Sequence, residues 1–112
     1  MADRYEGGIL CAANSANMLF YFNEEKYGIL PEEVKKELKI LCVLYCSDVG
    51  GIISMGFSED HRLMISTIEP IDEIGAELKI EKMRRDNEEL FSMLEEFSRK
   101  FFGEETFEED EI

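Results

Sequence analysis

Residues 71–102 contain no proline and carry apolar side chains with a seven-residue period, the feature that restricts the fold most. One row of the repeat holds Ile80, Asn87, Leu94 and Phe101, and the other holds Ala76, Met83, Leu90 and Phe97. A sustained period of seven favours an amphipathic helix whose apolar positions share one side. The pattern predicts one long helix over 71–102, about 48 Å long at about 1.5 Å per residue.

The second half of this predicted helix carries a candidate self-association surface. A helix of that length exceeds the width of a small sheet, so we expect its first half to pack on the chain's own sheet and its second half on a partner. The candidate residues are Leu90, Phe91, Leu94, Phe97 and Phe101. We expect a homodimer with antiparallel helices, since a parallel pairing places Lys79 against Arg84.

The segments before this helix predict two β-hairpins with a helix between them. Apolar runs at 9–13 and 18–22 flank the turn-forming residues 14–17, and a second pair of runs flanks 58–61. We therefore predict an α+β domain over residues 1–102 with the element order ββαββα. Its antiparallel sheet is covered by a mid-chain helix and the long C-terminal helix.

The mid-chain helix is predicted to begin near Pro31, where proline and two acidic residues suit the first turn. Apolar residues then recur at helical spacing, and Gly50 with Gly51 supplies a stop. Residues 40–46 are also rich in strand-forming residues, so a helix over 31–39 followed by a strand over 40–46 is the alternative.

Cys42 and Cys46 lie four residues apart within this mid-chain segment. A four-coordinate zinc ion needs two further ligands, and only His61 and Cys11 remain as nitrogen or sulfur candidates, with no paired spacing. A redox pair usually lies near a helix N-terminus, whereas Cys46 is near the predicted C-terminus. We interpret both cysteines as buried core residues.

The charge of the chain restricts its partners. The formal net charge is −14, and residues 103–112 hold six acidic side chains and no basic one. Nucleic acids and anionic membranes attract Lys and Arg, so neither is an expected partner. We expect 103–112 to be a disordered, solvating tail, with an interaction arm or a nucleic-acid mimic as the alternatives. The absence of a signal peptide or apolar span and the odd number of cysteines predict a cytoplasmic location.

No motif in the sequence indicates catalysis. The glycine pairs lack a phosphate-loop context, the calcium-loop pattern is absent, and His61 has no partner nearby in sequence except acids typical of a turn. The sequence therefore favours a non-enzymatic role and predicts no catalytic residue, cofactor or metal ligand.

Five short motifs in this order resemble a bacterial family of short, acidic, uncharacterised proteins, a domain of unknown function. They are Leu10-Cys11-Ala12-Ala13-Asn14, Tyr21-Phe22-Asn23, Leu30-Pro31-Glu32, Asp48-Val49-Gly50-Gly51-Ile52 and Asp72-Glu73-Ile74-Gly75. The resemblance covers residues 9 to about 102 and implies a bacterial cytoplasmic protein. It brings no activity, ligand or catalytic residue.

Size, acidity and the alternation of hairpins and helices are also similar to the dimeric chaperones of secretion systems, an analogy of fold alone. We therefore expect a protein–protein interaction module, either a homodimeric adaptor or a chaperone-like binder. The alternative is a small-molecule-binding or enzymatic domain with a pocket between sheet and helix.

Overall fold

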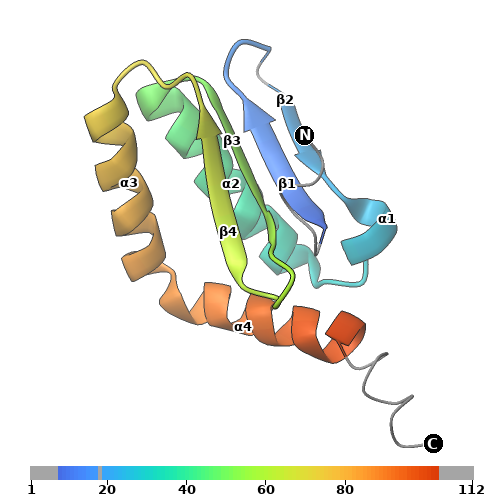
Figure 1. The fold of residues 1–112 in the computed structure, drawn as a ribbon. Coiled ribbons are helices and arrows are strands. Elements are labelled where there is room, and N and C mark those ends of the chain that lie inside the picture. The colour runs from blue at the N-terminus through green and yellow to red at the C-terminus, as the bar shows by residue number, and fades with distance from the viewer. Residues whose placement is uncertain (1–7, 18, 104–112) are drawn as a thin grey trace, which may run out of the picture.

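The computed structural model describes residues 8–17 and 19–103 as a four-stranded antiparallel sheet with helices on one face and at one end (Figure 1). The strands are β1 (Ile9–Asn14), β2 (Leu19–Phe22), β3 (Ile52–Phe57) and β4 (Leu63–Ile68), in the spatial order β2-β1-β3-β4. Both predicted hairpins and the α+β class are confirmed. A short helix that was not predicted, α1 (Glu24–Tyr27), follows the first hairpin, with the Asn23 side chain accepting from the Lys26 amide.

Helix α2 (Glu32–Val49) lies behind the sheet and covers it (Figure 1). It begins after Pro31 and ends at Gly50, whose φ of 74° is a conformation that favours glycine. The helix runs without interruption through 40–46, so the alternative of a strand there is wrong. Its buried residues are Leu38, Cys42, Tyr45, Cys46 and Val49.

The prediction of one continuous C-terminal helix is wrong, because the helical segment breaks at Asn87. Helix α3 (Glu73–Asp86) runs beside β4, and α4 (Glu88–Ser98) turns across the end of the sheet (Figure 1). A π-helical segment, η2 (Arg99–Gly103), follows. At the break, both the backbone amide and the side-chain Nδ2 of Asn87 donate to the Met83 carbonyl. Asparagine competes in this way with regular helical hydrogen bonding.

All three cysteines are free, and the structure places them in the core, as predicted for Cys42 and Cys46. Sequence spacing did not reveal that the Cys11 and Cys42 sulfur atoms lie 3.9 Å apart, joining β1 to α2. The contact with Cys42 and burial raise the pKa of the Cys11 thiol well above its usual value. The thiols therefore behave as small apolar groups that fill the space between sheet and helix.

Among the described residues, no helix combines the length and apolar character that crossing a bilayer requires. Residues 104–112, which hold most of the acidic tail, lie outside the described part of the chain.

Replacing Cys42 with alanine should lower the free energy of unfolding by about 1 kcal/mol, because the change leaves a small void against Cys11. Urea unfolding of purified, reduced protein measures this loss. Lys39→Ala, at an exposed position of the same helix, is the matched control and should change stability less. Unchanged stability of Cys42→Ala, or stoichiometric zinc in the unmutated protein, would contradict the assignment.

Candidate functional site

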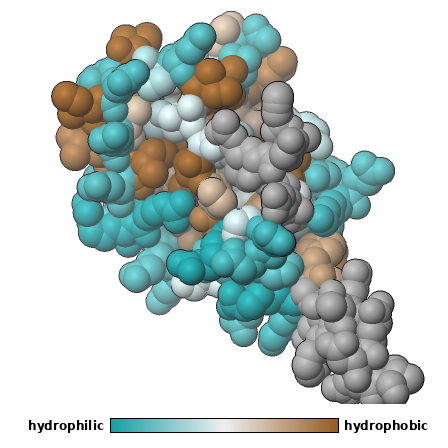
Figure 2. Space-filling model, in the orientation of Figure 1, coloured by the Kyte–Doolittle hydropathy of each residue, from teal (hydrophilic) through white to brown (hydrophobic). Residues whose placement is uncertain are grey.

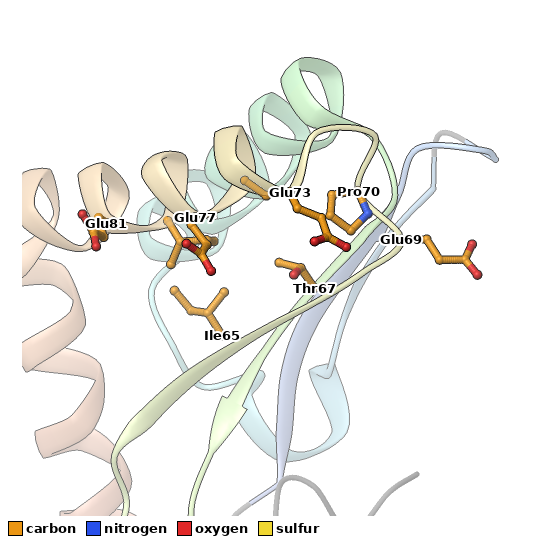
Figure 3. Close-up of a pocket in the computed structure, with 9 residues that line it drawn as sticks. Ile65, Thr67, Glu69, Pro70, Glu73, Glu77 and Glu81 are labelled. Carbon is orange, nitrogen blue, oxygen red and sulfur yellow. The ribbon is translucent and has the colours of Figure 1, made fainter.

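One candidate site among the described residues is a groove of about 630 Å³ between strand β4 and helix α3 (Figure 3). It lies at the edge of the sheet, because β3 pairs with one side of β4 and no described strand pairs with the other. Its apolar lining consists of Ile65, Pro70, Ala76 and Ile80, and its carboxylates are Glu69, Glu73, Glu77 and Glu81, with Thr67 between them. Figure 2 shows apolar surface between α3 and the sheet, bordered by hydrophilic side chains.

Local sequence explains how these residues come together. Ile65 and Thr67 are two apart in β4, so both point to the side of the sheet that faces the helices. Pro70 ends the strand, and the Asp72 side chain caps α3 by accepting from the Gly75 amide. Glu73, Glu77 and Glu81 then recur every fourth residue, which places three carboxylates along one side of α3.

The groove is acidic, and no lining residue is basic. Within the described part of the chain, the ion pairs formed by carboxylates do not involve any of the four groove glutamates. Nearby cations of α3 have other partners: Lys79 pairs with Asp48 on α2, and Lys82 pairs with Asp86 at 2.6 Å. The groove therefore presents uncompensated negative charge over an apolar floor.

The backbone of β4 is capped at one end of the groove and open at the other. The backbone amide of Ser58 donates to the Arg62 carbonyl, so the hydrogen-bonded positions of this antiparallel hairpin are Arg62 and every second residue after it. Leu63, Ile65 and Thr67 lie between these positions and therefore direct their amide and carbonyl groups away from β3. Those of Leu63 are satisfied: the amide donates to Glu95 at 2.8 Å, and the carbonyl accepts from Arg84 at 3.2 Å. No such side-chain cap reaches the backbone groups of Ile65 and Thr67 among the described hydrogen bonds.

A buried hydroxyl lies next to this open stretch. Tyr45 of α2 is fully buried, and its hydroxyl has no hydrogen bond of normal geometry within the described residues. Burial raises the pKa of Tyr45, and the neighbouring Thr67 side chain offsets this only in part. An unsatisfied hydroxyl at this depth is uncommon, and this one belongs to the core next to Thr67 and not to the lining of the groove.

The single histidine does not form a catalytic site. His61 lies in the β3–β4 turn, and its Nδ1 is 2.8 Å from the Ser98 hydroxyl. Ser98 is fully buried, so no substrate can reach its oxygen. The pair joins the turn to α4, which is a structural role.

The structure separates the five predicted self-association residues. Phe91 and Leu94 are buried in the core of the single chain. Leu90 and Phe97 are half-buried, and Phe101 is 49% exposed and stacks on Phe97 with ring centroids 4.4 Å apart. None of the five lines the groove. Self-association stays a prediction, now with fewer exposed residues in α4 to support it.

The described residues of the groove do not form a metal-binding set. Groups of three His, Cys, Asp or Glu residues placed to hold a metal ion do not occur among them. The four glutamates are spaced along the groove, so each carboxylate can pair with a different positively charged group of a bound partner. Sequence analysis missed this site, although the four-residue spacing of Glu69, Glu73, Glu77 and Glu81 was visible in it.

Comparison with known proteins adds a family and no activity. A family model described as a family of unknown function (DUF6145) matches residues 7–106. This confirms the predicted resemblance to a domain of unknown function. No curated protein and no solved structure matches the chain.

Replacing Glu95 with alanine should open the capped end of β4. The Leu63 amide then loses its acceptor, so its hydrogen exchange should accelerate and the free energy of unfolding should fall by about 1–2 kcal/mol. Glu96→Ala is the matched control, because Glu96 makes only an exposed ion pair with Lys100. Slow Leu63 exchange retained in Glu95→Ala would show that this end of the strand is protected in another way.

Proposed function

Because the chain belongs to the DUF6145 family, whose description names no activity, we propose its function from the groove: it is a protein–protein interaction module that holds a partner between β4 and α3. The observation that carries the proposal is the open strand edge at Ile65 and Thr67, lying beside an apolar floor. Unpaired strand edges next to a groove are common binding sites for segments of other proteins.

The alternative is a small-molecule or enzymatic site between sheet and helix, and the chemistry of the groove favours it less. General acid–base catalysis by carboxylates needs two of them placed together in one enclosed cleft, whereas the four glutamates of this groove are exposed along an open strand edge. His61 is bound to Ser98 of α4, away from these carboxylates. A groove that is open along a strand suits a polypeptide better than a small ligand that needs enclosure.

A photo-crosslinking residue placed at Glu77 should capture a protein partner in the native cells. The same residue at Lys36, on the exposed side of α2, is the matched control and should not capture that protein. The captured protein, once purified, should bind the unmutated chain, and Glu77→Trp should weaken this binding by filling the groove.

A small molecule that co-purifies at one equivalent and is released by Glu77→Trp would contradict the proposal. Equal capture of the same proteins from positions 77 and 36 would also contradict it, because the groove would then have no special role.

The proposal includes a homodimer that forms on a different surface. Ile40, Val43 and Leu44 are 49%, 40% and 53% exposed on the side of α2 that faces away from the sheet. Three large apolar side chains at helical spacing form a stripe that a second copy can cover. Around a two-fold axis at the level of residue 42, antiparallel α2 helices place Ile40 opposite Leu44 of the second copy, and Val43 lies beside the axis.

Light scattering at micromolar concentration should therefore give twice the chain mass of 13.0 kDa. Leu44→Glu should shift the mass to that of a monomer, because it places a charge in the apolar stripe. Phe101→Glu, in η2, tests the surface that the sequence predicted over residues 90–101 and should leave the dimer intact. A monomeric unmutated chain rules out the dimer, and a monomer only in Phe101→Glu assigns the contact to the C-terminal surface that contains η2.

A further inference from the structure

We propose that the groove binds an extended, basic segment that adds a fifth strand to the edge of β4 and pairs its Lys or Arg side chains with Glu73, Glu77 and Glu81. This inference rests on the proposed function, because it names the chemistry of the segment that the groove holds.

The backbone of β4 offers a short, defined length for strand addition. Leu63 is already capped by Glu95 and Arg84, so pairing cannot begin there. Ile65 and Thr67 both direct amide and carbonyl groups toward the groove, and together they can form the four hydrogen bonds of a short ladder. A segment of about five or six residues fits this length, at about 3.3 Å per residue.

The spacing of the glutamates matches that of an extended chain. Four helical residues rise about 6 Å, and two residues of a strand rise about 6.6 Å. Alternate side chains of an added strand therefore meet successive glutamates of α3, which Figure 3 shows across the groove from Ile65 and Thr67. The aliphatic stems of Lys or Arg can pack on Ile80 while their charged ends reach the carboxylates.

The other set of alternate side chains would lie on the opposite face of the sheet. There Met64 and Ile68 of β4 are 38% and 49% exposed. Apolar side chains such as Val or Ile in the added strand would cover them, as cross-strand neighbours do. The preferred segment thus alternates basic and β-branched residues.

Charge also distinguishes this occupant from a second copy of the chain. Pairing β4 with β4 of another copy would bring two sets of four groove glutamates together with no cation lining the groove. Like charges placed in this way repel, whereas a basic strand neutralises them. The acidic edge therefore selects a basic partner and rejects self-pairing.

The probe is a six-residue peptide of alternating valine and lysine, blocked at both ends, titrated into the full-length chain. NMR should show shifts of the Ile65 and Thr67 amides, and raising the salt concentration should weaken binding. The triple variant E73Q/E77Q/E81Q should bind at least about tenfold more weakly. The control E33Q/E37Q removes two exposed charges of α2 and should bind as the unmutated chain does.

Two N-methylated peptides test strand addition without changing the protein. Methyl groups on one alternate set of peptide amides should abolish binding, because those amides face β4, and methyl groups on the other set should be tolerated. Equal effects of the two methylation patterns overturn strand addition.

Equal binding of a peptide with glutamine in place of lysine overturns the basic specificity. The proposed protein-binding function is tested separately by crosslinking at Glu77, so it can stand when this inference fails.

Discussion

The arrangement of the whole molecule depends on the hydrogen bonds that Asn87 makes to the Met83 carbonyl. The backbone bond caps the C-terminus of α3, and the side-chain bond shares the same carbonyl; the Asn87 carbonyl then accepts from the Phe91 amide as α4 begins in a new direction. A straight helix would carry Phe91 and Leu94 past the end of the sheet into water. The turn instead buries both side chains, each worth about 1.5–3 kcal/mol.

The same turn determines which part of the sheet edge is closed. Because α4 crosses the end of the sheet, Glu95 reaches the Leu63 amide, and Arg84 near the end of α3 reaches the Leu63 carbonyl. The rest of α3 is held against α2, where Ala76 and Met83 are buried in the core and Lys79 pairs with Asp48. A capped end and an open, acidic stretch thus arise along one strand from a single change in helix direction.

Local signals in the sequence predicted both hairpins, the start of α2 at Pro31 and its end at Gly50. Each of these depends on residues that are close in sequence, such as turn formers and helix caps. The break at Asn87 was missed because a seven-residue apolar repeat fits one straight helix or two helices on the same core. The Cys11–Cys42 contact and the groove join residues far apart in the chain, and no spacing rule relates them. Of the site itself, only the row of glutamates could have been noticed beforehand.

An open strand edge next to exposed apolar residues is an aggregation hazard, and natural proteins commonly protect such edges with charge. Here the protecting charges are placed on the neighbouring helix, where they flank the open edge without covering it. Lysines on β4 itself would repel other strands by the same principle, but they would also repel a basic partner. Glutamates on α3 repel the acidic surface of another copy, in a chain whose net charge is −14, and they attract a cationic strand. The sign of the protecting charge therefore decides which strand can reach the backbone groups of Ile65 and Thr67.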